Sequence, residues 1–401
     1  MVQARAERAV RRIAFRLPDE GVWTGGVNYL ETVCKALLTH SDLGYEPMVF
    51  CSAEGDPGLL ARFQALLGER LIHEPGAAPK RRAGLLAALT LGRNRAALRL
   101  CERHRCDVIM EAADYMGWRF PAACLAWVPD FQDRHLPQLF SPWNLRRKSL
   151  GLRLQLATRR TVLLSSEDAR ADCEHFYPQA IGRTAVARFA VHPALHPGEN
   201  DPQVGASHRL PARYFYLPNQ YWAHKNHSRV VDALGLLRDQ GNHIVVASSG
   251  NPHDPRHIRH YAELRAKVAA QSLEKHFLFL GNIPSREVAI LMRSSVALLN
   301  PSLFEGWSTT VEEGKSLGVR MVLSDLAVHR EQVGAAAEYF DRNDASAIAA
   351  SLLKVWSDSR EPPTLAEQRA AASDALRRIR DFAVQFTRAC DQARRDSGRA
   401  F

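Results

Sequence analysis

The chain has 401 residues, of which 46% are hydrophobic and 24% charged, a balance that is typical of globular proteins and excludes an extensively disordered chain. This length predicts two domains, while the apolar runs are too short for a transmembrane helix and the N-terminal segment lacks the apolar core of a signal peptide. The 7 cysteines are scattered and form no CxxC pair, which indicates a protein of the reducing cytoplasm and argues against a structural zinc site.

The charge balance is basic, with 53 Lys and Arg against 43 Asp and Glu and a net charge of +10. Such an excess suits an acidic partner, whether nucleic acid, anionic lipid or a phosphorylated ligand. Basic residues gather in 80–105, where Glu102 is the one acid, and in 141–164, which has none. Because the residues between them are aliphatic rather than aromatic, a basic amphipathic surface is favoured over a nucleic-acid interface. A solvated helix face is the alternative interpretation.

The first half of the chain alternates short apolar segments with helical patterns. A strand is expected at 12–17, and apolar residues at helical spacing predict a helix at 25–38. Further strands are expected at 47–52, 106–111, 124–128 and 161–165.

The same alternation restarts after 192–211, a polar stretch rich in Pro and Gly that is expected to link two similar halves. Strands of the second half are expected at 214–217, 243–248, 277–280, 296–300, 320–324 and 338–340. Short strands alternating with helices predict right-handed βαβ units, and therefore an α/β fold with parallel sheets. In such sheets ligands bind outside the carboxyl ends of the strands, so functional motifs are expected directly after strands.

The most informative segment follows the strand that ends at Asn300. Ser308 or Thr309 is expected to cap a short helix, with Glu312 closing a capping box to Thr309 and Gly318 ending the helix. A helix that begins just after a strand presents free backbone N–H groups and the positive end of its dipole, and therefore attracts phosphate.

Two carboxylates flank this helix start, Glu305 before it and Glu313 inside it. Because carboxylates repel phosphate, they are expected to accept hydrogen bonds from sugar hydroxyls, Glu313 from a ribose and Glu305 from a transferred sugar. The alternative is that Glu313 is only a favourable charge near a helix start. The two acids, with seven residues between them in the segment from PSLFEGW to SLGVRMVLSD, resemble the E-x7-E signature of family 4 glycosyltransferases of the GT-B fold.

This resemblance implies an α/β architecture of two Rossmann-like, doubly wound parallel-sheet domains that face a central cleft. It implies an acceptor-side domain at 1–200 and a nucleotide-sugar-binding domain at 208–380. A C-terminal helix at 381–401 is expected to cross back to the first domain.

Several donor-binding residues follow from the same resemblance. Gly25 and Gly26 match the glycine pair that lets the backbone approach the donor phosphates, although an ordinary tight turn uses glycines too. Lys225 matches the lysine that reaches the diphosphate, where a point charge is suitable. Asn219 stands where many members have an arginine, so it is expected to donate a neutral hydrogen bond, and His224 is considered as an additional charge.

The remaining donor-side residues lie in two loops. Gly281, Asn282 and Ile283 match the loop whose backbone reads the nucleobase edge. The loop and helix start that carry Glu305 and Glu313 add Trp307, Ser308, Thr309 and Thr310 to the expected donor site.

On the acceptor side, many family members have a His-Asp pair in the loop after a first-domain strand. Here Pro129 precedes Asp130, so His135 is expected to supply the function of the missing histidine from further along the loop. Asp130 and His135 are therefore catalytic candidates together with Glu305 and Lys225. The alternative for Asp130 is a turn-stabilising role.

The implied activity is transfer of a hexose such as mannose or glucose, with retention, from a nucleoside-diphosphate sugar to an acceptor hydroxyl. Polysaccharide or glycolipid synthesis is the expected setting. Neither a cofactor nor a metal is expected, and the partners are the donor, a saccharide or lipid-linked acceptor and an anionic membrane surface, but no nucleic acid. The protein is expected in the cytoplasm, peripheral on the inner membrane face. Alternatives are a sugar-nucleotide epimerase, a pyridoxal-phosphate phosphorylase and a non-catalytic basic protein that binds RNA or membrane.

Overall fold

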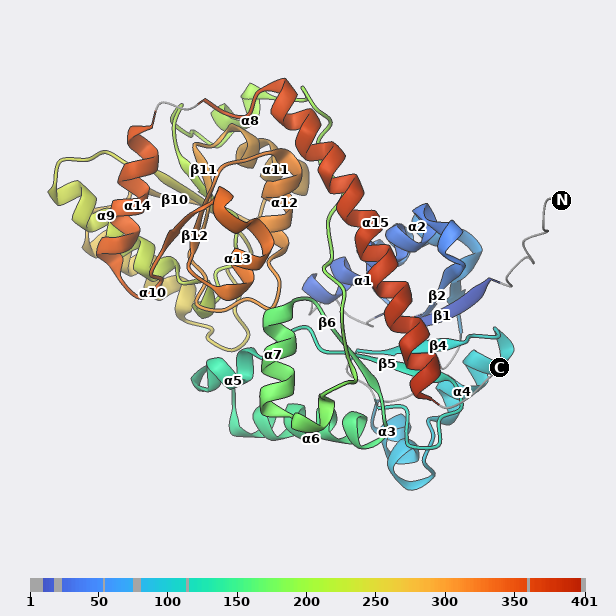
Figure 1. Ribbon diagram of the computed structural model, residues 1–401. Helices are drawn as coiled ribbons and strands as arrows, with labels where there is room; N and C mark the ends of the chain where they lie inside the picture. Colours follow the sequence, from blue (N-terminus) through green and yellow to red (C-terminus); the bar gives the residue numbers. More distant parts are fainter. Residues whose placement is uncertain are drawn as a thin grey trace. The chain divides into compact units, whose positions relative to one another are not determined.

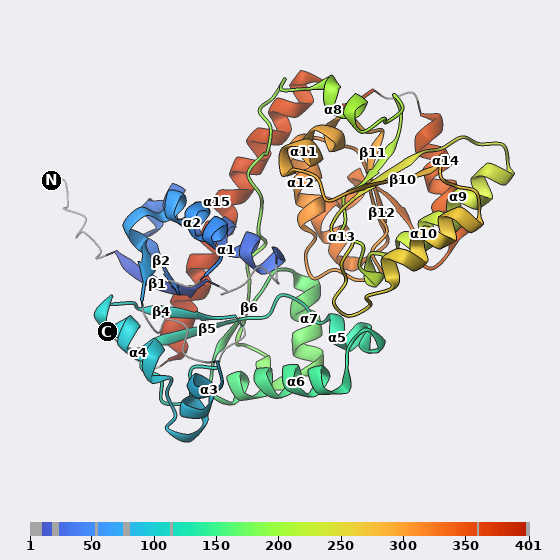
Figure 2. The ribbon, with the colours of Figure 1, turned by 180° about the vertical axis from the view of Figure 1, so that it is seen from behind.

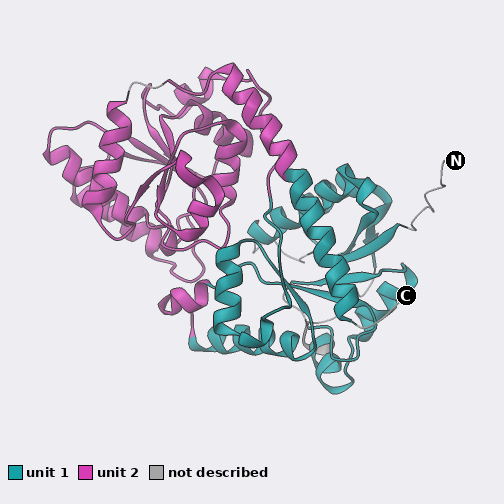
Figure 3. Cartoon of the chain, viewed as in Figure 1, with its two compact units in different colours: residues 1–131, 142–189, 379–401 teal, residues 132–141, 190–378 magenta. Residues whose placement is uncertain are grey.

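The computed structural model describes residues 10–17, 24–52, 55–74, 81–112, 115–358 and 361–397. The chain divides into two compact units, each built from segments that are distant in the sequence (Figure 3). Unit 1 consists of Met1–Phe131, Pro142–Phe189 and Ile379–Phe401. Unit 2 consists of Gln132–Ser141 and Ala190–Arg378.

Unit 1 is built on a parallel sheet of seven strands in the order β3-β2-β1-β4-β5-β6-β7 (Figure 1). Its strands are β1 (Arg11–Arg16), β2 (Tyr45–Cys51), β3 (Leu71–His73), β4 (Val108–Glu111), β5 (Ala123–Trp127), β6 (Thr161–Leu164) and β7 (Thr184–Val186). Its helices are α1 (Thr24–Thr39), α2 (Pro57–Leu67), α3 (Arg81–Thr90), α4 (Arg95–Arg103), α6 (Pro142–Ala157) and α7 (Glu167–Phe176). The edge strands β3 and β7 have no counterpart among the expected strands.

Unit 2 is built on a parallel sheet of six strands in the order β10-β9-β8-β11-β12-β13. Its strands are β8 (Phe215–Leu217), β9 (Val246–Ser249), β10 (Phe277–Gly281), β11 (Ala297–Asn300), β12 (Met321–Ser324) and β13 (Glu338–Phe340). Its helices are α5 (Gln132–His135), α8 (Pro202–Ser207), α9 (His227–Asp239), α10 (His260–Ala270), α11 (Ser285–Ser294), α12 (Thr309–Leu317), α13 (Ala327–Val333) and α14 (Ala345–Ser357).

The two sheets share one topology. In each, the first strand of the unit lies inside the sheet, the second and third strands follow on one side, and the fourth strand begins the other side. This is the doubly wound arrangement that the alternating pattern predicts, and the expected fold class is confirmed. The strand order reverses between β1 and β4 in unit 1 and between β8 and β11 in unit 2, which are the positions where such sheets bind ligands.

The sheet of unit 2 is covered on both faces, as the burial of its strands requires. Neighbouring residues of β11 point to opposite sides, so Leu299 packs with α9 and α14 and Leu298 packs with α11 and α12 (Figures 1 and 2). Both leucines are fully buried. Truncation of either to alanine would cost about 2–5 kcal/mol of folding free energy.

The long helix α15 (Leu365–Asp396) belongs to both units. Its first part packs in unit 2, where Gln368 accepts a hydrogen bond from the backbone N–H of Gly198 at 2.9 Å. Its last part completes the core of unit 1, where Phe382 and Phe386 are buried and the Phe386 ring lies 6.2 Å from that of Phe15.

The terminal helix begins at Leu365, where the Ala/Arg-rich tail from Thr364 onward predicts a helix, and passes to unit 1 at residue 379, close to the expected 381. Two other features differ from the expected ones. Residues 132–141 group with unit 2 although they lie inside the expected first domain of 1–200. Part of the expected linker at 192–211 is the helix α8, which Asp201 caps. These differences arise from contacts between segments distant in the chain, which a local pattern does not record.

Candidate functional site

Two loops of unit 2 leave the carboxyl ends of β8 and β11, where the strand order reverses. The loop after β8 leads through a short helical turn, Ala223–Lys225, into α9, and the loop after β11 leads into α12. The side chain of Asn219 in the first loop donates to that of Asn300 at the end of β11, with 3.3 Å between the two atoms. Both side chains are buried. The two loops are therefore joined at the position where a ligand is expected.

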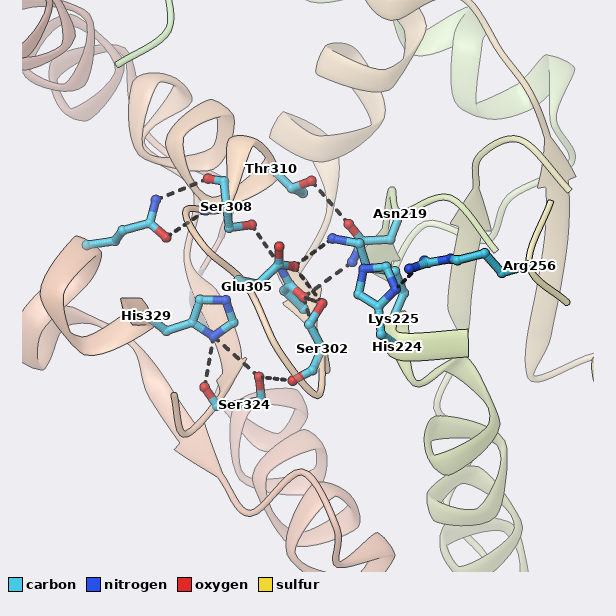
Figure 4. Close-up of polar contacts among 12 residues, drawn as sticks. Asn219, His224, Lys225, Arg256, Ser302, Glu305, Ser308, Thr310, Ser324 and His329 are labelled. Atoms are coloured by element: carbon cyan, nitrogen blue, oxygen red, sulfur yellow. Dashed lines mark hydrogen bonds and ion pairs between the residues drawn. The ribbon is translucent and has the colours of Figure 1, made fainter. Parts of the chain in front are cut away.

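Asn300 is the centre of the polar network that holds these loops. Figure 4 labels its partners Asn219, Ser302 and Ser308. Its Oδ1 accepts from the Ser302 hydroxyl at 2.7 Å and from the Ser302 backbone N–H at 3.2 Å, and its Nδ2 donates to the Ser308 hydroxyl at 3.0 Å. Thr310 donates to Asn219 Oδ1 at 3.2 Å, so the first turn of α12 is held to the loop after β8. A buried network with its members bonded in this way fixes the loop geometry.

Lys225 and Glu305 form an ion pair across the two loops. Lys225 Nζ lies 2.6 Å from Glu305 Oε1, and the Ser302 hydroxyl donates to the same oxygen at 2.7 Å. The side chains are only 16% and 9% exposed. Burial by itself would raise the pKa of Glu305, but the charge of Lys225, the nearby His329 and the hydrogen bonds from Lys225 and Ser302 outweigh it and hold this pKa below its ordinary value. Glu305 is therefore a carboxylate that its neighbours keep ionised.

Glu313 has the opposite environment. Its carboxylate makes no hydrogen bond or ion pair within the described part of the chain, and burial raises its pKa to about 7. The adjacent Glu312 instead accepts hydrogen bonds from Lys315 and from the Gln332 amide, each at 3.2 Å, and forms an ion pair with Arg378 at 3.4 Å. Glu313 is left as a half-buried acid that titrates near neutral pH and can accept hydrogen bonds from a ligand.

The start of α12 differs from the expected capping box. Ser308 is the N-cap residue, but its hydroxyl accepts from Asn300 and caps no backbone N–H. The side chain of Gln332 bonds Ser308 instead, accepting from its N–H and donating to its carbonyl, each at 3.1 Å. The predicted box between Thr309 and Glu312 is wrong. Ser308 is the N-cap residue, and Gln332 of the neighbouring helix α13 bonds both Ser308 and the carboxylate of Glu312.

Two features of α12 bear on a ligand. Gly318 ends the helix with a φ of 72°, as the sequence predicts. The backbone N–H of Ser308 is already bonded to Gln332, whereas those of Thr309 and Thr310 have no acceptor among the described residues. The first turn of α12 therefore offers two N–H groups to an anion.

The loop 281–283 lies beside the loop after β8. The Gly281 carbonyl accepts from the Gly250 N–H at 2.8 Å, and Gly281 has a φ of 70°. Gly250 in turn approaches the backbone of Asn219 so closely that a Cβ there would lie 2.4 Å from the Asn219 carbonyl oxygen. Asn282 is exposed, and Ile283 packs on the core below. The loops after β8, β9 and β10 thus form one edge.

The other predicted residues are distributed over both units. Gly25 and Gly26 lie in the first turn of α1 and Asp130 follows β5, all in unit 1. His135 ends α5 in unit 2, where its ring stacks on Phe304, the neighbour of Glu305, with 5.0 Å between ring centroids. Trp307 is half-buried in the loop after β11.

One prominent residue of this region was not predicted from the sequence. Arg256 donates to the Gln132 side chain at 2.8 Å, lies 3.3 Å from His224 Nδ1 and packs over the ring of Phe140. Arg256 holds the segment 132–141 against the rest of unit 2. It also places its guanidinium beside His224, the residue before Lys225. No motif surrounds it in the sequence.

His224 does not supply the additional charge that was considered for it. It is buried, and burial together with the charges of Lys225 and Arg256 lowers its pKa well below the ordinary value, so the ring is neutral at physiological pH.

Neither a cluster of metal-ligating side chains nor a transmembrane helix occurs among the described residues. No group of three or more His, Cys, Asp or Glu within the described ranges is arranged to hold a metal ion. None of the helices in those ranges combines the length and the apolar character needed to cross a bilayer.

Comparisons with known proteins place this site in a family. Residues 208–374, which include the network around Asn300, match the family model "Glycosyl transferases group 1". The O-antigen chain mannosyltransferase B of Escherichia coli is 32% identical over 80 residues, which amount to 20% of this chain and 21% of that protein.

Solved structures agree over nearly the whole chain. A glycosyltransferase from Rickettsia africae is similar with a TM-score of 0.69 at 15% identity, covering 96% of this chain and 98% of that one. Anabaena HepE in complex with UDP and glucose is similar with a TM-score of 0.66 at 16% identity, covering 94% and 98%. Residues 208–374 therefore match a group 1 glycosyl transferase domain, and the chain has the GT-B fold of two doubly wound parallel sheets.

Proposed function

We propose that this protein transfers a hexose, with retention of anomeric configuration, from a nucleoside-diphosphate sugar to an acceptor hydroxyl. The observation that carries the proposal is the arrangement at the carboxyl edge of the sheet in unit 2. There a lysine, two backbone N–H groups without acceptors among the described residues and two acids of opposite environment lie within the part of the chain that matches the group 1 glycosyl transferases.

In this proposal the leaving diphosphate is held by Lys225 and by the N–H groups of Thr309 and Thr310. Transfer requires above all that charge on the departing diphosphate be stabilised, which is an electrostatic task for groups already in place. Asn219 adds a neutral hydrogen-bond donor where many members have arginine. Because Lys225 already forms an ion pair with Glu305, the lysine side chain is oriented before the donor binds. It therefore does not have to be ordered during the reaction.

The two acids have separate roles in the proposal. Glu313, which has no partner of its own, accepts hydrogen bonds from the ribose hydroxyls, and Glu305 accepts from a hydroxyl of the transferred sugar while it positions Lys225. The backbone of 281–283 reads the nucleobase edge, with Gly281 supplying the left-handed turn.

The departing phosphate would accept the proton of the attacking hydroxyl on the same face, so the proposal needs no protein nucleophile. The family resemblance assigns Gly25 and Gly26 to the donor phosphates and Asp130 and His135 to the reacting sugar and acceptor. For His135 the stacking on Phe304, next to Glu305, supports this assignment.

A mannose or glucose donor is proposed from the relatives. One partial relative is named as an O-antigen chain mannosyltransferase, and one similar structure holds UDP and glucose. A role in polysaccharide or glycolipid synthesis agrees with the first of these names.

An anionic membrane surface is proposed as a partner from the exposed face of α6. Trp143 and Leu150 on this helix are 73% and 60% exposed, and Arg146 and Arg147 lie exposed between them. Apolar side chains flanked by cations on one helix are typical of helices that lie in a membrane interface. Such a protein would be peripheral on the cytoplasmic face, and loss of binding to anionic vesicles at low salt would remove this part of the proposal.

The test is to incubate the protein with UDP-glucose or GDP-mannose and to analyse the products. Thermal unfolding with each nucleotide sugar first identifies the donor, because a bound ligand raises the unfolding temperature. Nuclear magnetic resonance of the product then shows whether the anomeric configuration is retained. Lys225→Ala should abolish transfer, whereas Lys354→Ala, which removes an exposed lysine paired with Glu338, should not. An epimerised nucleotide sugar without any acceptor product would instead identify an epimerase.

A further inference from the structure

A pocket of about 780 Å³ opens in unit 1, and none of the residues that line it is assigned to transfer. It is lined by four arginines, Arg153, Arg159, Arg183 and Arg395, together with Leu156 and Asp396. These residues come from the end of α6, the turn that follows it, the turn before β7 and the end of α15. The pocket therefore lies where β6 begins, at the edge opposite the carboxyl ends of the strands.

Two of the lining groups are already engaged with the protein. Arg183 donates to the carbonyls of Leu156, at 2.7 Å, and of Gln179, so its guanidinium is fixed to the backbone at the end of α6. Asp396 accepts from the Thr161 hydroxyl at 2.7 Å. These bonds fix the position of Arg183 in the pocket wall. The bond from Thr161 also occupies one carboxylate oxygen of Asp396, the one acid among the lining residues.

The other three arginines have no such partner. Arg153, Arg159 and Arg395 form no hydrogen bond from their guanidinium groups and no ion pair within the described part of the chain. The sequence from 141 to 164, which supplies two of them, contains no acid at all. Three guanidinium groups around one pocket repel one another, and an anion bound among them would relieve that repulsion.

The chemistry of the lining indicates which anion. An arginine offers a planar fork of N–H donors that matches the oxygens of a phosphate, and several arginines together favour a group with more than one negative charge. The volume lies within the range of pockets that hold small molecules of nucleotide size. The partial negative charge at the end of α6 offsets some of the repulsion, but this effect fades beyond the last turn.

We propose that this arginine pocket of unit 1 is a second binding site, one that takes the phosphate or diphosphate group of a ligand other than the sugar donor. The ligand is either a soluble phosphorylated compound or the phosphate of a lipid headgroup. The residues that line the pocket include none of those assigned to the donor, to the reacting sugar or to the acceptor. The proposal therefore does not depend on the transferase assignment.

The test uses inorganic pyrophosphate as the probe and hydrogen exchange as the readout. At low salt, pyrophosphate should slow amide exchange at the end of α6, in 178–184 and at the end of α15. Because exchange is resolved along the chain, pyrophosphate bound near Lys225 gives a separate signal. The Arg153→Gln/Arg395→Gln double variant should weaken protection of the pocket segments by about tenfold or more, since two charge-assisted contacts are lost.

A matched control is available on the same helix. Arg146→Gln/Arg147→Gln removes the same charge from exposed positions of α6 outside the pocket and should leave the protection by pyrophosphate unchanged. This control is used in the pyrophosphate series alone, because these two arginines belong to the face of α6 proposed to bind membranes. Both double variants change exposed side chains, and their unfolding temperatures verify that each is folded.

A parallel series with vesicles distinguishes the two sources of phosphate. Protection by pyrophosphate points to a soluble ligand. Protection by phosphatidylcholine vesicles containing phosphatidic acid, but by neither pyrophosphate nor phosphatidylcholine alone, points to a lipid headgroup. Either result, if lost in the pocket variant, supports the site. Absence of protection by both probes, or equal protection in the pocket variant, overturns it.

Discussion

Glu305 and Glu313 lie near the start of the same helix, yet the loop and the helix give them opposite environments. Glu305 is held by Lys225 and Ser302, which keep its pKa below the ordinary value, whereas Glu313 has no partner among the described residues and burial raises its pKa to about 7. The pKa values of two residues of one sequence signature are therefore shifted in opposite directions. The difference shows that spacing alone does not assign a role to an acid, because the role depends on which cation the fold brings to it.

Loss of Lys225 should have the largest effect on this pair. Lys225→Ala leaves the buried carboxylate of Glu305 without its cation, so we expect a loss of about 3–5 kcal/mol of folding free energy by chemical denaturation. Turnover should fall by about a thousandfold or more, because the diphosphate loses its cation.

A second variant separates the two effects. Lys225→Ala/Glu305→Gln removes the orphaned charge and should recover most of the stability while transfer stays lost. If stability does not recover, Glu305 is not the group that Lys225 neutralises.

Substitution of Glu313 should affect the donor and spare the fold. Glu313→Gln removes an unpaired carboxylate, so folding stability is maintained, while the KM for the nucleotide sugar rises by about 10- to 100-fold through weaker hydrogen bonds to the ribose.

The neighbouring Glu312→Gln is the matched control. It breaks contacts with Lys315 and Arg378 and should lower stability without raising the donor KM. If instead Glu312→Gln raised the donor KM and Glu313→Gln lowered only the stability, Glu312 rather than Glu313 would be the residue that binds the donor.

The pH dependence of donor binding sharpens the contrast. If the ribose bonds the ionised form of Glu313, binding lowers its pKa from about 7, so donor affinity falls as pH drops below 7 and binding releases a proton. Calorimetry in buffers of different ionisation enthalpy measures that release, and Glu313→Gln should abolish it.

The raised pKa of Glu313 also predicts how folding stability changes with pH. Because the folded pKa is raised, this group stabilises the protein at low pH and loses that contribution as pH rises through about 7. The stability of Glu313→Gln relative to the natural protein should therefore increase with pH across the interval from about 4.5 to about 7.

The smallest effect is expected from Ser302. Ser302→Ala removes one hydrogen bond to Glu305 and one to Asn300, so we expect a loss of about 1–2 kcal/mol in stability and a change of only a few-fold in turnover. Lys225 still holds Glu305, and the activity should therefore exceed that of Lys225→Ala by far. If Ser302→Ala and Lys225→Ala lost the same amount of activity, the ion pair between Lys225 and Glu305 would not be more important for transfer than the hydrogen bonds of Ser302.

Much of the fold follows from the sequence, because the alternation of buried strands and helices is a local pattern. The inner strands, the helix at 25–38 and the end of α12 at Gly318 are visible in this way. The two edge strands, the Gln332 cap of Ser308 and the grouping of 132–141 with unit 2 are not, since each depends on residues far along the chain.

The candidate site divides in the same manner. The signature around Glu305 and Glu313 can be read from spacing, and Lys225 from its position after a strand. The pairing of Lys225 with Glu305, the bond between Asn219 and Asn300 and the contact of Arg256 with Gln132 exist only in the folded chain, because the partners lie 80 or more residues apart.

The passage of α15 from one unit to the other has a consequence for biosynthesis. Unit 1 begins at the first strand of the chain, but its core includes Phe382 and Phe386, which emerge from the ribosome only after all of unit 2. Unit 2 can thus mature during translation, while the nascent first sheet must wait with an uncovered apolar surface around Phe15 until elongation has passed residue 386.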